Sequence, residues 1–457
     1  MRRLFLVIAE TVLLFSAALT ATHIRFGSES SDVLFSQRGW MKLVMLTAVI
    51  QLAFYLFDLY DLPATRRYRR VIINLLIALG VATVLLSILF YVVPALQLGR
   101  GVFLVDIALI LAIIPAWRLV VAWSAGHPQF GVRERVLILG SGDQAIELAR
   151  ATLQRRNAGF HIVGFVDNKP ELIGKSLINP TVIGLTEDIC SLVEQHQVDR
   201  IVVAVADRRG KFPTEELLNL SLSGRVAVEE SARYYERLTG KIASEMLRPS
   251  WLIFSRDSRF SDLDYHVRRV LNVGFAAVGL VLSLPIMLLT ALAVKLESRG
   301  PVFYIQERVG KNGRTFKIIK FRSMRVGAEA KSGPVWAEEN DPRVTRVGRI
   351  IRKLRFDELP QFVNVLRGNM NFVGPRPERP MFVEQLSEMV PYYSQRHVVK
   401  PGLTGWAQIK YPYGASVEDS VEKLRYDLYY IKNQSLLLDA IIMFETFKII
   451  MFGRGGR

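Results

Sequence analysis

The feature that most constrains this chain is a set of four long apolar runs within its first 125 residues. They cover 4–22, 41–57, 71–93 and 102–123. Each run is about as long as a helix that crosses a bilayer, roughly 20 residues. Hydrocarbon offers the backbone no hydrogen-bond partners, so such a segment must be helical. We therefore predict a four-helix transmembrane region over 1–125, which could serve as a plain anchor or take part in handling a substrate.

The arginines between these runs predict their orientation. Arg2 and Arg3 precede the first run, four arginines lie within 66–70, and further basic residues close the fourth run at Arg118, Arg133 and Arg135. Positive residues in short loops stay on the cytoplasmic side of a membrane. The sequence therefore predicts a cytoplasmic N-terminus, and four crossings return the chain to the cytoplasm.

The hydrophobic pattern changes to an alternation of strands and helices after Arg135. Residues 135–142 resemble a strand that enters a glycine-rich turn, 143–155 a helix, and 161–168 and 198–207 later strands. Gly140, Gly142 and Ala145, with Asp167 at the end of the second strand, form the outline of a dinucleotide-binding fingerprint. We predict a Rossmann-like domain over 131–250. No Tyr-x-x-x-Lys pair occurs in the chain, so a structural or regulatory domain and a true nucleotide-binding domain both stay open.

Composition narrows the partners of the chain. The formal net charge is +17, and the basic residues flank apolar segments. This balance favours an acidic membrane leaflet or phosphorylated substrates, and no nucleic-acid-binding signature is present. Cys190 is the only cysteine, which excludes an internal disulfide, and we expect it to be a small core residue.

The stretch 341–377 carries the chemistry. Val347, Ile350, Ile351 and Leu354 form an apolar stripe with helical spacing, and arginines occupy the other faces. A second helix is predicted from Asp357 to a stop at Gly368, because Pro360 fits only a first turn. Asp357 and Glu358 would then lie at a helix N-terminus beside many guanidinium groups. Such a site suits a diphosphate, with a carboxylate nucleophile and a divalent cation, whereas the bland alternative is that Asp357 only caps the helix.

Five ordered blocks identify a resemblance. They are GPVFYIQERVG (300–310), FKIIKFRSM (316–324), RKLRFDELPQFVNVLRGNMNFVGPRP (352–377), PGLTGWAQI (401–409) and YDLYYIKNQS (426–435). Together they resemble the small bacterial phosphoglycosyl transferases, the polyprenyl-phosphate hexose-1-phosphate transferases, over about 262–457. The preceding domains are similar to those of the long-form members that initiate exopolysaccharide synthesis.

The resemblance implies a reaction and a set of site residues. Asp357 would attack a UDP-sugar, release UMP and hold a phospho-sugar covalently until undecaprenyl phosphate accepts it. Glu358 and Asp357 would hold Mg²⁺. The substrate-binding residues would be Arg352, Arg376, Lys320, Arg322, Gln361 and Asn364. The enzyme would reside in the bacterial inner membrane with a cytoplasmic catalytic domain. The identity of the hexose is not encoded in these blocks.

A fifth apolar run, 268–295, follows the Rossmann-like domain. If it crossed the membrane, the stretch 341–377 would emerge outside, away from cytoplasmic nucleotide sugars. Ser283 and Pro285 favour a bend, because proline removes a backbone hydrogen bond. We expect a re-entrant helix in a monotopic mixed α/β catalytic domain, as the resemblance implies, with a plain fifth span as the alternative.

Two other functions compete with transfer. One is a nucleotide-sugar modifying or nucleotide-sugar-sensing protein that uses the Rossmann-like domain. The other is a membrane scaffold for polysaccharide assembly, and a Rossmann-like domain without catalytic residues also offers a surface for a homodimer. The intact blocks around Asp357 and Arg376 favour the transferase.

Overall fold

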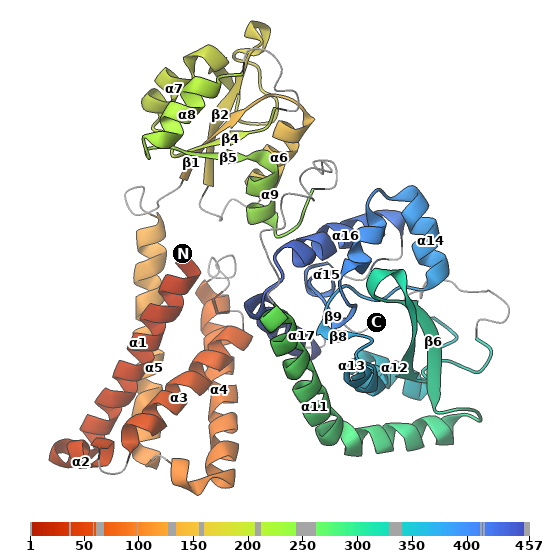
Figure 1. Cartoon of the computed structure of the whole chain (residues 1–457). Coiled ribbons are helices and arrows are strands. Elements are labelled where there is room, and N and C mark those ends of the chain that lie inside the picture. The colour runs from red at the N-terminus through yellow and green to blue at the C-terminus, as the bar shows by residue number, and fades with distance from the viewer. Residues whose placement is uncertain are drawn as a thin grey trace. The chain divides into compact units, whose positions relative to one another are not determined.

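The computed structural model describes residues 2–35, 38–57, 59–60, 68–97, 99–126, 134–154, 160–205, 212–243, 262–328, 341–411, 414 and 416–451. They form two compact units (Figure 1). The first comprises Met1–Val136 with Gln154–Ile162, and the second comprises Leu137–Leu153 with Val163–Arg457. Each is described separately below.

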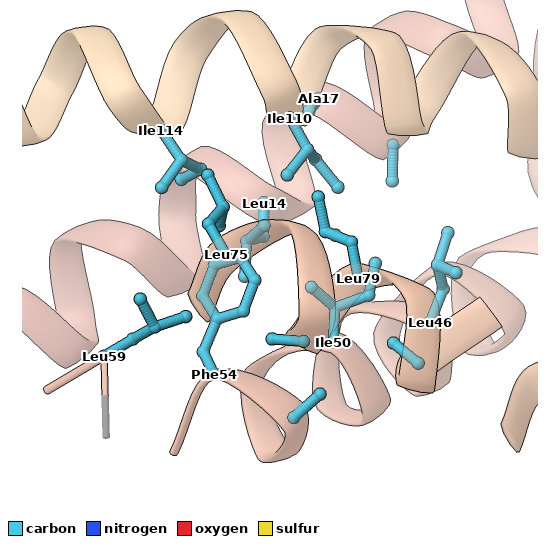
Figure 2. Packing of buried hydrophobic residues seen from close by; sticks show 14 of the residues in the cluster. Leu14, Ala17, Leu46, Ile50, Phe54, Leu59, Leu75, Leu79, Ile110 and Ile114 are labelled. Atoms are coloured by element: carbon cyan, nitrogen blue, oxygen red, sulfur yellow. The ribbon is translucent and has the colours of Figure 1, made fainter. Parts of the chain in front are cut away.

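The N-terminal apolar runs form helices, as predicted. They are α1 (Arg2–Phe26), α3 (Gly39–Leu56), α4 (Tyr68–Val92) and α5 (Arg100–Gly126), with a short α2 (Ser30–Phe35) after the first. Figure 2 shows their shared core, in which Leu14, Phe54, Leu75 and Ile114 come from four different helices. All four long helices, the first counted through Phe35, are long and apolar enough to cross a membrane. The protein is therefore a membrane protein.

A buried ion pair joins the first and last of these helices. Arg118 Nε and Nη2 donate to the two carboxylate oxygens of Glu10, each at 2.8 Å, and Nη1 donates to the Leu59 carbonyl at 2.7 Å. Between helices in lipid the hydrophobic effect gives little association, so packing and polar contacts must hold the helices together. The bidentate pair therefore fixes α1 against α5.

The middle domain is an α/β sheet. Its strands are β1 (Glu134–Leu139), β2 (Phe160–Asp167), β3 (Val182–Leu185), β4 (Arg200–Val203) and β5 (Ala227–Glu230), in the order β3-β2-β1-β4-β5. β2 pairs in parallel with β3, and β4 with β5. The helices α6 (Asp143–Gln154), α7 (Ile189–His196), α8 (Thr214–Leu222) and α9 (Ser231–Thr239) connect or follow these strands. The Rossmann-like strand order confirms the predicted α/β class.

The backbone conformation of the turn after β1 requires a glycine at its first glycine position. Gly140 has φ +112°, and a β-carbon there would lie 2.9 Å from the Ala204 carbonyl oxygen. Asp167 accepts a hydrogen bond from the Lys169 N–H at 3.2 Å. Both residues therefore serve the local fold, and whether the turn also binds a nucleotide stays a prediction.

Cys190 is exposed, so its prediction as a core residue is wrong. The buried face of α7 consists of Ile189, Leu192 and Val193. Cys190 follows Ile189 by one residue, a rotation of about 100° around a helix, which turns it away from this face.

The C-terminal domain is mixed α/β, with a long apolar helix at its start. That helix, α11 (Asp262–Glu297), leads into the antiparallel hairpin of β6 (Phe303–Val309) and β7 (Thr315–Phe321). Two short strands, β8 (Asn371–Val373) and β9 (Gly402–Thr404), pair in parallel. The remaining α-helices are α12 (Arg346–Lys353), α13 (Phe362–Arg367), α14 (Pro380–Met389), α15 (Trp406–Lys410), α16 (Val417–Lys432) and α17 (Leu436–Met451).

Helix α11 is continuous and bent. It contains Pro285, and Figure 1 shows it changing direction partway along. Many of its apolar side chains are exposed, including Val281 and Leu282, while Ala276 and Val294 pack into the domain. The stretch Tyr265–Glu297 is apolar enough to cross a membrane. A proline kink is the physical reason for such a bend, and the path of the helix in lipid stays a prediction.

The segment after α9 packs onto the C-terminal domain. Trp406 Nε1 donates to the Gly240 carbonyl at 2.7 Å, and the Ile242 N–H donates to the Arg425 carbonyl at 3.1 Å. Ile242 is buried in one cluster with Leu386, Val390, Tyr393, Leu424 and Leu428. The end of the α/β domain is thus part of the core around α16.

We expect Ile242→Asp to destabilise the C-terminal domain by about 3 kcal/mol, because it places an unpaired charge in an apolar cluster. Thermal unfolding of the detergent-solubilised protein measures this loss. Ile173→Asp is the matched control, since Ile173 is exposed, and it should change the melting temperature little. Equal losses in the two variants would show that Ile242 is not a core residue.

Candidate active site

The acidic pair lies in a 3-10 helix, not at the start of an α-helix as predicted. This 3-10 helix spans Phe356–Gln361, and the α-helix α13 begins only at Phe362. Arg355 has φ +60° and ends the turn of α12, which changes the chain direction before the pair. Pro360 lies inside the 3-10 helix, and because it has no N–H it cannot donate the backbone hydrogen bond that an α-helix would need there. The predicted stop at Gly368 is confirmed, with φ +81°.

The apolar stripe on α12 is only half buried. Val347 and Ile351 pack with Phe321 and Val294, whereas Ile350 and Leu354 are exposed. Gly348 is buried and lies close to the segment just after β7, since a β-carbon there would lie 2.0 Å from the Ser323 carbonyl oxygen. The last turn of α12 carries Arg352, whose charge acts on Asp357.

Three cations converge on one oxygen of Glu358. Lys320 Nζ and Arg376 Nη2 each lie 3.2 Å from Glu358 Oε1, and Arg355 Nη1 lies 3.5 Å from the same atom. Glu358 and Lys320 are largely buried. Burial opposes ionisation of Glu358, but the nearby Lys320, Arg376 and Arg355 prevail and hold its pKa well below the ordinary value. Glu358 is therefore a carboxylate that organises cations from three separate segments.

Asp357 is in a different electrostatic state. Its side chain is buried, and its Oδ1 accepts no hydrogen bond from any residue that the structure describes. Burial and then the Glu358 carboxylate raise its pKa above the ordinary value, while Lys320, Arg355 and Arg352 oppose this shift. A buried oxygen without a partner costs free energy unless a ligand satisfies it. Asp357 is thus the open carboxylate of the pair.

Gln361 and Asn364 lie beneath the pair, with different environments. Gln361 is 2% exposed, and its Nε2 has no hydrogen-bond partner among the described residues. Asn364 is fully buried, donates to the Lys317 carbonyl at 2.7 Å and accepts from the Ile319 N–H at 3.1 Å. Asn364 therefore fixes β7, and with it Lys320, against α13, whereas Gln361 keeps an amide donor that no described residue accepts.

Arg322 contacts the chain at the end of α11, and its place among the substrate-binding residues stays a prediction. Its Nη1 donates to the Arg299 carbonyl at 3.0 Å, and its Nη2 donates to the Ser298 carbonyl at 2.8 Å. These contacts satisfy carbonyls at the end of α11, as a C-terminal cap does. Alternation alone would place Lys320 and Arg322 on one face of a strand. β7 ends at Phe321, so Arg322 lies beyond the strand and does not follow this alternation.

Ser283 and Pro285 belong to α11 and not to the cluster around Glu358. The Ser283 hydroxyl donates to the Leu280 carbonyl at 3.4 Å, a contact within its own helix. The role of both residues at the bend stays a prediction.

The Gly-Pro-Arg-Pro turn places Arg376 at the pair and is held on two sides. Arg308 Nη1 donates to the Pro377 carbonyl at 3.0 Å, and Arg396 Nη2 donates to the Arg376 carbonyl at 3.1 Å. Sequence reasoning missed the roles of Arg355, Arg308 and Arg396. Arg355 stands two residues before Asp357, which is a local signal, but nothing local links Arg308 or Arg396 to the turn.

The residues fit a magnesium ion only with help from a substrate. No group of three or more histidine, cysteine or acidic side chains that could hold a metal occurs in the described part of the chain. Mg²⁺ commonly binds one or two carboxylates and completes its shell with water and substrate phosphates. The open Asp357 Oδ1 and the adjacent Glu358 carboxylate match this mode.

Comparison with known proteins agrees with the geometry. The bacterial sugar transferase family model matches residues 263–453, and a CoA-binding domain model matches residues 55–211. The chain is 41% identical to a UDP-N-acetylgalactosamine-undecaprenyl-phosphate N-acetylgalactosaminephosphotransferase of Aeromonas hydrophila, over 57% of this chain and 60% of that protein. It therefore spans less than two thirds of that relative.

The chain spans a larger share of the length of two further relatives. A putative undecaprenyl-phosphate N-acetylgalactosaminyl 1-phosphate transferase of Bacillus subtilis is 51% identical over 28% of this chain and 72% of its own length. A UDP-galactose-lipid carrier transferase of Erwinia amylovora is 31% identical over 78% of this chain and 76% of its own length. The family model includes the segment that holds Asp357 and Glu358. The chain belongs to the bacterial sugar transferase family.

Proposed function

We propose that this protein transfers a sugar 1-phosphate from a UDP-sugar to undecaprenyl phosphate and releases UMP, as a first membrane step of exopolysaccharide synthesis. The observation that carries the proposal is the pairing of an open buried carboxylate, Asp357, with a carboxylate that gathers Lys320, Arg355 and Arg376. The activities for which the Aeromonas and Bacillus relatives are named support the same class of reaction.

The first half-reaction forms a covalent intermediate. A carboxylate oxygen of Asp357 attacks the β-phosphorus of the UDP-sugar, and the bond from that phosphorus to the bridging oxygen breaks. The electron pair leaves with UMP, so no proton has to be supplied. Lys320 and Arg376 stand where cations offset charge on the phosphates, which is the main task of a phosphoryl-transfer site.

The second half-reaction regenerates the enzyme. An oxygen of undecaprenyl phosphate attacks the same phosphorus, and the bond to the Asp357 oxygen breaks, which restores the carboxylate. The product is undecaprenyl-diphospho-sugar. A mixed carboxyl–phosphate anhydride is reactive enough to pass its group on, so a carboxylate is a suitable nucleophile.

A divalent cation fits this scheme. Asp357 and Glu358 would hold Mg²⁺ beside the diphosphate, and when bound it would neutralise charge on the phosphate oxygens. Gln361, whose Nε2 lacks a partner among the described residues, can donate to a substrate oxygen.

The proposed reaction also predicts how the protein lies in the membrane. We place the protein in the bacterial cytoplasmic membrane with the catalytic domain on the cytoplasmic side, where UDP-sugars occur. The bend of α11, its exposed apolar side chains and Pro285 support a re-entrant helix. Such a helix would bring the soluble sugar donor and the lipid acceptor to the same depth at the membrane surface.

The test is UMP release by the detergent-solubilised chain with Mg²⁺, undecaprenyl phosphate and a panel of UDP-hexoses and UDP-N-acetylhexosamines. Release of UMP with one donor, together with a lipid-linked diphosphate sugar, is the expected result and names the sugar. If every donor left UMP at background, the transferase assignment would fail.

In the pH–rate profile of UMP release, the midpoint of the acidic limb should lie above about pH 4, the ordinary range of an aspartate pKa. The nucleophile acts deprotonated, so UMP release rises with pH as Asp357 ionises, and burial and Glu358 raise its pKa. Single-turnover UMP release between about pH 4 and pH 8 measures the limb. In Glu358→Gln the limb should move to lower pH, because a neighbouring negative charge is removed. An unchanged midpoint in that variant would contradict the coupling.

A further inference from the structure

The position of Arg376 depends on a turn whose backbone is held by other segments. The Gly374 N–H donates to the Thr404 carbonyl at 2.9 Å, and the Gly402 N–H donates to the Pro375 carbonyl at 3.0 Å. The Arg376 guanidinium contacts Glu358 Oε1 at 3.2 Å, yet the side chain is 32% exposed and projects from the Gly-Pro-Arg-Pro turn. Proline contributes no N–H, so the two prolines of the turn remove donors that could fix its backbone. Whatever holds the backbone carbonyls here therefore determines where the guanidinium stands.

Arg396 holds one of these carbonyls from a distant segment. It lies in the 3-10 helix Tyr393–Val398, is 5% exposed, and its Nη2 donates to the Arg376 carbonyl at 3.1 Å. The same Nη2 lies 2.7 Å from Asp427 Oδ2 on α16, and Nη1 donates to the Tyr393 hydroxyl at 2.5 Å. One buried guanidinium thus joins α16 to the turn.

Stability alone gives little reason for a charge pair at this position. Desolvating an arginine and an aspartate costs several kcal/mol, and well-packed apolar residues often replace a buried pair without loss. An apolar side chain, however, cannot donate to a backbone carbonyl. Arg396 is therefore needed as a donor to the Tyr393 hydroxyl and to the Arg376 carbonyl, and of these two contacts only the second reaches the turn. Asp427, 1% exposed, compensates the charge.

We propose that Arg396 is a positioning residue for sugar-phosphate transfer, which holds Arg376 at Glu358 through the backbone of the Gly-Pro-Arg-Pro turn and is itself fixed by Asp427. The proposal rests on the function proposed above. Arg396 acts on the reaction only through Arg376, so the two residues form one unit, and their effects on the rate do not multiply.

A double-mutant cycle tests this dependence. In UMP release, Arg396→Met should lower kcat about 10- to 100-fold, the loss expected of a misplaced group. Arg376→Ala combined with Arg396→Met should be no slower than Arg376→Ala alone. Losses that multiply in the double variant would overturn the proposal, because independent sites behave additively in free energy.

Hydrogen exchange of the full chain in detergent provides a readout that does not need activity. Arg396→Met should speed exchange in peptides that cover 371–379, and unchanged exchange there would overturn the proposal. If wild-type protein released no UMP, the proposed function would fail, while exchange would still decide the positioning role. The two failures are therefore distinguishable.

Two variants control for folding. Arg396→Lys keeps the charge beside Asp427 but loses the planar fork, so it should fold and still show faster exchange at the turn. Arg322→Met is the matched buried arginine, since Arg322 also donates to backbone carbonyls but at the end of α11. It should leave exchange of 371–379 unchanged, and its rate loss should multiply with that of Arg376→Ala. The reverse pattern for Arg322 and Arg396 would overturn the proposal.

Discussion

Asp357→Asn should abolish transfer, with UMP release reduced about 10⁴-fold or more, as expected when a covalent nucleophile is lost. Asparagine keeps the volume of the side chain but is a much weaker nucleophile toward phosphorus. Without undecaprenyl phosphate, wild-type protein should release a burst of about one UMP per site and gain the mass of a sugar phosphate. The variant should show neither. Intact-protein mass spectrometry and a single-turnover UMP assay measure both results.

The control for this variant is Asp341→Asn. Asp341 is also buried, but its oxygens accept from the N–H and guanidinium of Arg343, so its loss should lower stability and leave the burst and the mass shift present. A burst that persists in Asp357→Asn would mean that Asp357 is not the nucleophile. The bound sugar phosphate would then have to be mapped to another side chain.

Glu358→Gln should lower both stability and activity. Glutamine keeps the shape but removes the charge that Lys320, Arg355 and Arg376 share. Breaking a buried ion pair on one side costs about 3 kcal/mol, because the remaining charge is left uncompensated. We also expect UMP release to fall roughly 100-fold, the cost of losing a residue that orients charged groups in a site. Thermal unfolding and the UMP assay, run on one preparation, measure the two losses.

Glu422→Gln separates the two effects. Glu422, on α16, contacts two cations: Arg425 on the same helix and Lys241 on the segment after α9. It does not belong to the acidic pair. It should lower the melting temperature while UMP release stays close to wild type. If Glu358→Gln behaved in the same way, Glu358 would be structural and the cations around it would not serve the reaction.

Local sequence patterns predicted the parts of the fold that depend on neighbouring residues. The apolar runs predicted the helices of the membrane region, because length and polarity alone decide whether a segment suits a bilayer. The alternation after Arg135 predicted the α/β sheet, and ordered motif blocks predicted the family. Asp357, Glu358, Lys320 and Arg376 were found because they lie in those blocks, and the structure brings three of them together at one oxygen.

The use of individual side chains depends on contacts between segments that are distant in the sequence. Lys320 and Arg322 belong to one motif, yet one pairs with Glu358 and the other caps α11. A sequence motif cannot distinguish these duties, because the partners are backbone carbonyls contributed by another element. The same holds for Arg396, which reaches the turn from 20 residues away. The helical start at Asp357 failed for a related reason. Arg355 adopts a left-handed conformation that the packing of α12 and the three-cation contact compensate, and such a conformation is unfavourable for an isolated arginine.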